Sequence, residues 1–369
     1  MKNRKPAGLL TSSHRSTKIK KRDPFFDNAR FILVALVVLG HLVSPVREGS
    51  DILFFANNFL ASFRMPALIL ITGYFTKRFH QDKGKFLKQI SVNIFIPYLM
   101  FQIFYLWMEG LAGSLPEVLG NLFAPTFGMW FLLSLFTWNL LLFPFAKLKH
   151  PIFTAVLIAL GIGWVDQAGE FLSISRTFVF FPLFLVGHYV RKDQLEWFKT
   201  GKAKMLGVLS LVGSLLMLSV FSLEEARNAL LARHPYAEIA DSALEGTWLR
   251  LVFYFIMILG IFAFLPWVPK KKLIFTPLGM RTAYIYILHL FFIKIFYQLE
   301  IFPQEAETRF LLAVPVIWLA IVFFTSSNFV VFFTKPLIEG KAAVPFLLKL
   351  PRNRKTFHSH SWSGQKNIF

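Results

Sequence analysis

The sequence predicts an all-α, polytopic integral membrane protein: a bundle of about ten transmembrane helices with both termini in the cytoplasm. First, 55% of the 369 residues are hydrophobic and 17% are aromatic, whereas a soluble domain is nearer to about 45–50% apolar. Second, apolar runs of membrane-spanning length alternate with short polar stretches. Third, the basic residues concentrate in every second polar stretch. Together these features favour membrane-spanning helices over a soluble core.

Ten apolar segments approach the length of about 20 residues that a helix needs to cross a hydrocarbon core. They span residues 24–43, 51–75, 86–108, 128–146, 151–166, 173–190, 205–223, 247–267, 274–297 and 308–333. The fifth is the shortest, and the sequence shows no internal repeat and no separate soluble domain. We therefore expect a single membrane domain over residues 23–336, flanked at each end by a basic cytoplasmic tail.

The distribution of charge fixes the expected orientation of these helices. Most of the 40 Lys and Arg residues lie in regions that an alternating chain with a cytoplasmic N-terminus places inside: 1–23, 76–85, 147–150, 191–204, 268–273 and 334–369. The outward loops are mostly acidic, and their basic residues are Arg47, Arg227 and Arg233, with Arg176 and Arg309 at helix edges. This asymmetry follows the positive-inside rule. The net charge of +20 therefore indicates membrane topology rather than binding to nucleic acid.

The two ends of the chain are polar and basic. We expect residues 1–22 and 337–369 to be disordered or to lie on the anionic inner leaflet. A cleaved signal peptide is disfavoured because the first apolar run is long and the SPVREGS that follows it has no small-x-small cleavage pattern. The sequence has no cysteine, which excludes disulfides and thiolate chemistry, and no histidine cluster has the spacing of metal ligands. We expect no metal and no permanently bound cofactor.

The first segment carries ionisable side chains that a lipid-facing helix would avoid. Charged groups inside a bilayer are costly, so a chain that keeps them usually uses them. Arg30 and His41 are eleven residues apart, which at ~100° per residue places both on one stripe of the helix, about 16 Å apart along its axis. Asp27 precedes Arg30 by three residues and can pair with it. A neutral imidazole at the outer end could act as a general base near pH 7.

A structural explanation of the same residues stays open at this point. Arg30 could snorkel to the interface or pair with Asp27, and His41 could hydrogen-bond a helix backbone. The start of the segment is clearer, because Asp23 suits the N-cap of a helix and Pro24 its first position.

Four further polar residues occur in predicted helices. Arg64 lies beside Pro66 in the second segment, where it could bond the carbonyl that the proline leaves without a partner or line a reaction cavity. Arg176 opens the sixth segment on the outer side and could meet a substrate or anchor the helix. Tyr286 and His289 are three residues apart and share a face of the ninth segment. His289 could form a second polar wall of the cavity or simply bond a neighbouring helix.

Six stretches of the sequence form an ordered set of motifs. The first is Arg30, ten residues, then Gly40-His41 and Pro45. The others are FRMPALILITGYF from Phe63, FIPYLMFQ from Phe95, MWFLLSLFTW from Met129, SISRTFVFFPLFLVGHYV from Ser173 and PLGMRTAYIYILHLFF from Pro277. In this order they resemble the membrane-bound acyltransferase family three, which includes acetylases of cell-surface sugars and fucose 4-O-acetylase-like proteins. The resemblance runs from about residue 23 to about residue 336, nearly the whole chain.

The resemblance implies ten core helices and the transfer of an acyl group from cytoplasmic acyl-CoA to a hydroxyl group, often outside the cytoplasm. It makes His41 the expected catalytic residue and Arg30 its motif partner. Many relatives carry basic residues just before the Pro-Tyr of the third helix. Here Lys85 and Lys88 lie further upstream, and Asn93 is nearer to the proline.

We therefore expect a membrane O-acyltransferase with acetyl-CoA as co-substrate and a cell-envelope carbohydrate as acceptor, in a bacterial-type cytoplasmic membrane. The expected catalytic residues are His41, Arg30 and Arg64; the expected substrate-binding residues are Asp27, Arg176, Tyr286 and His289; the expected CoA-binding residues are Arg30, Lys85 and Lys88. A transporter or flippase for a lipid-linked sugar is the alternative, because buried arginine and histidine also line translocation paths. A catalytically silent scaffold would leave these residues without a purpose.

Overall fold

The computed structural model describes residues 22–76, 83–111, 113–169, 171–304 and 306–340 of the chain, so most of the two expected tails, 1–22 and 337–369, lies outside the described residues. Every regular element within those ranges is helical. Seven helical segments are long and apolar enough to cross a membrane: Pro24–Gly49, Asp51–Phe75, Lys83–Met108, Phe127–Phe145, Gly201–Leu218, Ala243–Trp267 and Thr308–Thr325. Shorter apolar helices are Pro151–Trp164, Ile174–Tyr189, Thr282–Gln298 and Asn328–Ile338. The predicted all-α, polytopic membrane fold is confirmed.

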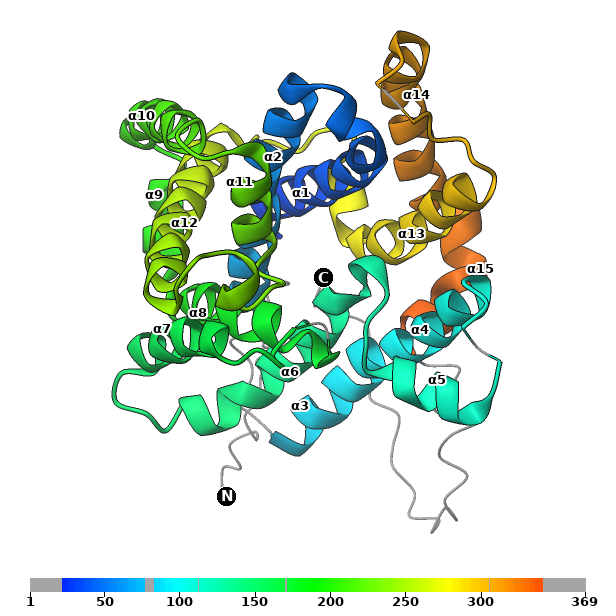
Figure 1. The fold of residues 1–369 in the computed structure, drawn as a ribbon, viewed down its shortest axis with the longest axis horizontal. Helices are drawn as coiled ribbons and strands as arrows, with labels where there is room; N and C mark the ends of the chain where they lie inside the picture. The colour runs from blue at the N-terminus through cyan, green and yellow to red at the C-terminus, as the bar shows by residue number, and fades with distance from the viewer. Residues whose placement is uncertain (1–21, 77–82, 112, 170, 305, 341–369) are drawn as a thin grey trace, which may run out of the picture.

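The helices form two flanks around a central pair (Figure 1). The central pair is α1 (Pro24–Val43) and α2 (Asp51–Phe75), which pack against each other. The left flank holds α10 (Gly201–Leu218) and α12 (Ala243–Phe264), with α11 (Leu223–Leu231) in contact with both α2 and α12. The right flank holds α13 (Thr282–Gln298), α14 (Thr308–Thr325) and α15 (Asn328–Ile338). The remaining helices are α3 (Lys83–Ile90), α4 (Ile96–Met108), α5 (Leu115–Leu122), α6 (Trp130–Phe145), α7 (Pro151–Gly161), α8 (Ile174–Tyr189) and α9 (Lys192–Trp197).

α1 begins as the sequence predicts and lies inside the bundle. The side chain of Asp23 accepts a hydrogen bond from the backbone N–H of Phe25 at 3.1 Å, and Pro24 occupies the first turn. α1 contacts α2, α13 and α14, and most of its residues are buried. A 3₁₀ turn, Ser44–Gly49, then leads into α2. α1 is therefore a central helix, and its polar side chains point at protein rather than at lipid.

α2 is held against α8 by two close backbone contacts. A Cβ atom on Gly73 would lie 2.1 Å from the carbonyl oxygen of Phe184, and one on Gly187 would lie 2.0 Å from that of Leu70. Both distances are far below van der Waals contact, so only glycine lets the two helices approach this closely, as small residues do elsewhere in membrane helix packing. This contact fixes the position of α2, which carries Arg64.

The tenth predicted helix, 308–333, is wrong as a single element, because α14 ends at Thr325 before α15 starts. The hydroxyl groups of Thr325 and Ser326 donate to carbonyl oxygens one turn earlier, and Ser327 caps α15. Three consecutive hydroxyl side chains thus favour local hydrogen bonds over a continuous helix. Arg281 donates to the carbonyl oxygen of Ser326 at 2.6 Å, which satisfies a group that the break leaves open.

Two other predicted helices differ in detail. The ninth, predicted from residue 274, begins only at Thr282, because the 3₁₀ turn Thr276–Met280 precedes α13. The third is continuous but contains a π-helical turn, Ser91–Phe95, between α3 and α4. Pro97 follows this turn and has no N–H to donate, which favours a local change in the hydrogen-bond pattern.

Two short helices, α5 and α11, lie in loops for which we expected no helix. Each begins with a capping box, in which a serine and a glutamate three residues later exchange hydrogen bonds with the backbone: SLPE from Ser114 and SLEE from Ser222. This pattern is a helix-start signal that is visible in the sequence. α11 matters for the site because it carries Arg227.

Candidate active site

His41 lies in the last turn of α1, on the interior side of the bundle. The centroid of its ring is 5.0 Å from that of Phe127 and 5.3 Å from that of His289. Phe127 belongs to a 3₁₀ turn before α6, and His289 lies in α13, so three separate segments meet here. His41 is partly exposed although Gly40 and Leu42 on either side of it are buried. The imidazole is therefore partly accessible at the point where these three segments meet.

His289 is fully buried, and one hydrogen bond defines its tautomer. Its Nδ1 atom lies 3.0 Å from the carbonyl oxygen of Ile285. A carbonyl oxygen can only accept, so Nδ1 carries the proton and Nε2 is an acceptor. Nε2 is buried, and the described part of the chain supplies no hydrogen-bond partner for it. Buried acceptors are normally satisfied, so this atom, next to His41, is suited to a hydroxyl group from a substrate.

Arg64 reaches from α2 to the last turns of α1. Its Nη1 atom is 3.4 Å from Oδ1 of Asn57 and 3.5 Å from the carbonyl oxygen of Leu36. A Cβ atom on Gly40 would lie 1.4 Å from Nη1, so the guanidinium occupies the space that a larger residue at position 40 would fill. Although Pro66 frees a carbonyl group of α2, these contacts direct Arg64 towards α1. The carbonyl group that Arg64 contacts therefore belongs to α1, and the expected place of Arg64 in the lining of a cavity stays a prediction.

Tyr286 holds the turn that carries Phe127. Its hydroxyl group donates to the carbonyl oxygen of Gly128 at 2.7 Å, and its ring centroid is 5.8 Å from that of His289. Phe127 has a φ of 48°, in the left-handed region that a bulky residue seldom adopts. Such a conformation persists only where the surroundings fix it. Tyr286 therefore positions Phe127 against His41, and its expected role in substrate binding stays a prediction.

Arg30 and Asp27 lie at the opposite end of α1. Nη2 of Arg30 is 2.5 Å from Oδ1 of Asp27, and Arg30 is only 2% exposed. Arg22 also pairs with Asp27, at 2.9 Å, and the guanidinium of Arg30 lies 5.1 Å from the ring centroid of Phe75. The ion pair that the i,i+3 spacing predicts is confirmed. Asp27 thus has a structural role, and its expected contact with substrate stays a prediction.

A small internal cavity follows the same stripe of α1. It is lined by Val34, Leu68, Thr72, Phe131, Thr282 and Tyr286. Val34 is four residues after Arg30 and seven before His41, so these three side chains share one face of the helix. The hydroxyl group of Thr282 is buried and has no partner among the described residues. The face of α1 that carries Arg30 and His41 therefore borders this cavity at Val34, beside the Thr282 hydroxyl group.

Arg176 lies near the start of α8, on the predicted outer side. Its Nε atom donates to the carbonyl oxygen of Leu231 at 3.3 Å, and its guanidinium lies 5.1 Å from the ring centroid of Trp130. Together with Arg233 it lines a surface cavity. Arg176 therefore anchors its helix and also lines a cavity. Both roles expected from the sequence, contact with a substrate and anchoring of the helix, are compatible with this geometry, and the contact with substrate stays a prediction.

The two lysines expected to contact CoA, Lys85 and Lys88, are exposed on α3. Within the residues that the structure describes, no group of three His, Cys, Asp or Glu side chains could hold a metal ion.

A bundle of apolar helices with a histidine pair and an arginine in its interior defines a membrane protein with a buried polar site, the property of membrane enzymes and transporters. The family comparison decides between these classes: the model of the acyltransferase domain, family three, matches residues 23–333. The chain belongs to this acyltransferase family and is a transferase of groups other than aminoacyl groups. No curated protein and no solved structure matches the chain.

Proposed function

We propose that this membrane acyltransferase moves an acetyl group from cytoplasmic acetyl-CoA to a hydroxyl group of a cell-envelope carbohydrate, with His41 as the general base. The observation that carries the proposal is the meeting of His41, His289 and Arg64 at one end of α1. This arrangement combines a group that can take a proton, a buried acceptor and a cation. Acyl transfer to a hydroxyl group uses a general base and a cation or donor that stabilises the oxyanion, and the acceptor can orient the substrate.

The donor would approach from the predicted cytoplasmic end of α1. The phosphates of acetyl-CoA carry negative charge; Arg30 lies at that end of α1, and Lys85 and Lys88 are exposed on α3, on the predicted cytoplasmic side. The pantetheine arm would follow the face of α1 from Arg30 to His41, a distance of about 16 Å along the helix axis. The thioester would then arrive beside the imidazole.

In the transfer step, His41 takes the proton of the acceptor hydroxyl as its oxygen attacks the carbonyl carbon of the thioester. The bond between carbon and sulfur breaks when the intermediate collapses, and the imidazolium returns the proton to the leaving thiolate. Arg64 donates hydrogen bonds to the oxyanion that forms on the carbonyl oxygen. His289 accepts through Nε2 a hydrogen bond from a second hydroxyl group of the acceptor and so orients the acceptor for attack. A variant of this scheme passes through an acyl-histidine on His41.

A multi-pass protein with this inward bias of positive charge fits the cytoplasmic membrane of a bacterial-type cell. The transporter alternative predicts substrate movement without consumption of acetyl-CoA. It draws no support from the family, which is defined by acyl transfer.

The test uses the purified full-length protein with labelled acetyl-CoA, with and without a carbohydrate acceptor. The wild-type protein is expected to transfer label to the acceptor, and His41→Ala to fold normally and lose transfer. A control variant is His150→Ala, since His150 lies in the loop before α7. Transfer that survives in His41→Ala at the wild-type rate would refute the assigned role of His41.

A further inference from the structure

The predicted outer side of the protein is poor in basic residues, yet the fold gathers most of them in one place. The five outward arginines expected from the sequence are Arg47, Arg176, Arg227, Arg233 and Arg309. Four of them, all but Arg309, lie around the end of α1 that carries the proposed catalytic imidazole, and they come from three separate segments of the chain. We call these four residues the arginine cluster.

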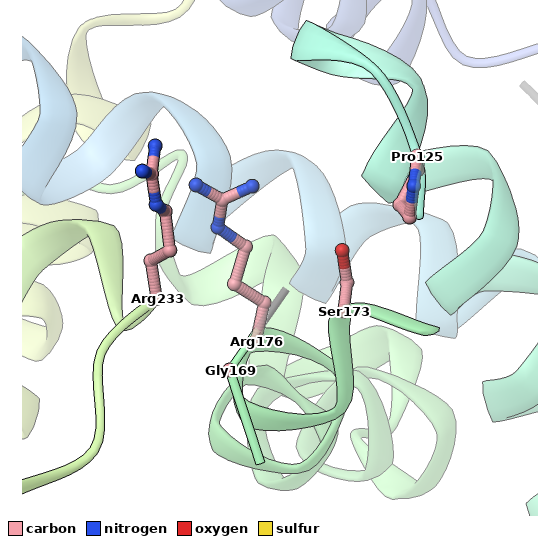
Figure 2. A pocket seen from close by; sticks show the side chains of 5 residues that line it. All are labelled: Pro125, Gly169, Ser173, Arg176 and Arg233. Carbon is pink, nitrogen blue, oxygen red and sulfur yellow. The ribbon is translucent and has the colours of Figure 1, made fainter. Parts of the chain in front are cut away.

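One half of the arginine cluster lines a surface cavity. Arg176 and Arg233 line this cavity together with Ser173, Pro125 and Gly169. Figure 2 shows both guanidinium groups and the Ser173 hydroxyl group pointing to the same side, with Pro125 across from them. Guanidinium groups bind carboxylates and phosphates through paired hydrogen bonds, so this cavity is suited to an anion.

The other half of the arginine cluster meets at Ser44. Nη1 of Arg47 donates to the Ser44 hydroxyl oxygen at 2.8 Å, and Nη2 of Arg227 donates to the same oxygen at 3.4 Å. Arg47 also pairs with Glu48 at 2.8 Å. Burial lowers the pKa of the Arg227 guanidinium to about 10, and the charge of Arg47 is the next largest cause. The charge of Arg233 also lowers this pKa, whereas two nearby glutamates raise it. Arginines that repel one another at a partly buried site favour a bound counter-charge.

Both halves are built on the segments that surround His41. Ser44 follows His41 by three residues, in the turn after α1. Trp130, on which Arg176 lies, starts α6 directly after the turn that carries Phe127. An anion held by the arginine cluster would therefore lie next to the imidazole on its predicted outer side.

We propose that the arginine cluster binds a negatively charged group of the acceptor, and that the acceptor is an anionic carbohydrate bearing a carboxylate or a phosphate. This inference rests on the proposed acyl transfer, because it assigns the outer mouth of that site to the acceptor. The charged group is held by the guanidinium groups while a hydroxyl group of the same molecule reaches His41. The negatively charged group of the acceptor is either the carboxylate of a uronate residue in the glycan or the phosphate that links a glycan to its lipid carrier.

Direct binding to the full-length protein in detergent tests this inference without relying on catalysis. The probes are a labelled oligouronate, the same oligosaccharide after reduction of its carboxylates to hydroxymethyl groups, a glycosyl diphosphate, and the same sugar without the diphosphate. At least one anionic probe is expected to bind about tenfold more tightly than its neutral counterpart. This preference should fall as salt rises, because it is electrostatic. The anionic probe that binds more tightly shows whether the charged group is a uronate or a phosphate.

The matched variants are Arg176→Gln with Arg233→Gln, and Arg309→Gln as the control. Arg309 is also on the predicted outer side but is exposed on α14, outside the arginine cluster. The double variant is expected to lose the preference for the anionic probe, and the control to keep it. Equal binding of charged and neutral probes by the wild-type protein overturns the inference even if a variant fails to fold. A preference that persists in a folded double variant also overturns it.

A separate arm measures consumption of labelled acetyl-CoA by the wild-type protein, with both neutral and anionic acceptors. If acetyl-CoA is consumed but the neutral acceptor is used as well as the charged one, the proposed acyl transfer stands and the anionic acceptor is refuted. If an anionic probe binds through the arginine cluster but no acetyl-CoA is consumed, the donor assignment fails instead. The two failures therefore give different results.

Discussion

Gly40→Ala is expected to abolish most of the acyl transfer without unfolding the protein. The new Cβ atom would lie 1.4 Å from Nη1, 2.4 Å from Cζ and 2.8 Å from Nη2 of Arg64. All three atoms belong to the far end of a flexible side chain. Arg64 therefore moves and the helices stay, so the change displaces one guanidinium group from its place beside the last turn of α1.

The size of the effect follows from the role of Arg64. Removal of one hydrogen-bond donor to an oxyanion costs about 2.7–4 kcal/mol of transition-state stabilisation, which is a factor of about 10²–10³ in kcat. The effect on folding is small by comparison, because alanine is favoured over glycine in a helix interior by up to about 1 kcal/mol. Gly40→Ala should therefore lower kcat strongly while its unfolding midpoint stays close to that of the wild-type protein.

The assay is a double-mutant cycle on kcat with labelled acetyl-CoA and a working acceptor, using Gly40→Ala, Arg64→Gln and the pair. If Gly40 acts only by making room for Arg64, the pair loses no more than Arg64→Gln alone. Gly161→Ala is the matched control, because nothing lies within 4 Å of a Cβ atom at that glycine. The reasoning is refuted if Gly40→Ala keeps the wild-type kcat, or if the losses of the two single variants add in the pair.

Three further variants test other parts of the structure. Asp27→Asn removes the carboxylate from a buried ion pair with Arg30. Breaking such a pair costs about 3–5 kcal/mol, so the unfolding midpoint in detergent should fall clearly. An unchanged midpoint would contradict the buried pair. Gly73→Ala places a Cβ atom 2.1 Å from the backbone oxygen of Phe184, which cannot rotate away. We therefore expect a loss of about 1–3 kcal/mol in stability, measured by thermal unfolding. Normal stability would show that α2 and α8 are further apart. His289→Phe removes the acceptor Nε2 and should lower kcat by about tenfold, the effect of one lost hydrogen bond, with little change in the KM for acetyl-CoA. A rise in that KM with an unchanged kcat would move His289 to the donor site.

The sequence predicts α1 almost completely, because local rules decide each of its features. Asp23 and Pro24 define its start by capping chemistry, and the structure has both in place. The spacing of Asp27 and Arg30 predicts their ion pair, which the structure contains at 2.5 Å. Helical periodicity predicts that Arg30 and His41 share a face, and that face lies inside the bundle.

The sequence does not predict how distant segments meet around His41. Phe127 lies in a turn with a left-handed backbone conformation that no pattern in the chain signals, and the hydrogen bond from Tyr286 to Gly128 depends on tertiary packing. Arg64 was expected near a cavity, but its contact with Gly40 could be known only once α1 and α2 were placed against each other. Local periodicity fixes which face a residue occupies, whereas the partner on the next helix depends on the whole fold.

A hydropathy pattern also does not reveal where hydroxyl side chains interrupt a helix. The run 308–333 has no charged residue after Arg309 and reads as one long helix, yet Thr325, Ser326 and Ser327 end α14 and start α15. Arg281 completes this break by donating to the carbonyl oxygen of Ser326.

One unbroken helix, α1, joins the ion pair of Arg30 at one end to the imidazole of His41 at the other, and α2, α13 and α14 enclose it. If the two substrates are recognised at these opposite ends, neither of them has to travel across the bilayer. Only the acyl group would then have to reach the far end of α1, attached to the flexible pantetheine arm of the coenzyme. An enzyme that worked in this way would need no alternation between inward-open and outward-open states.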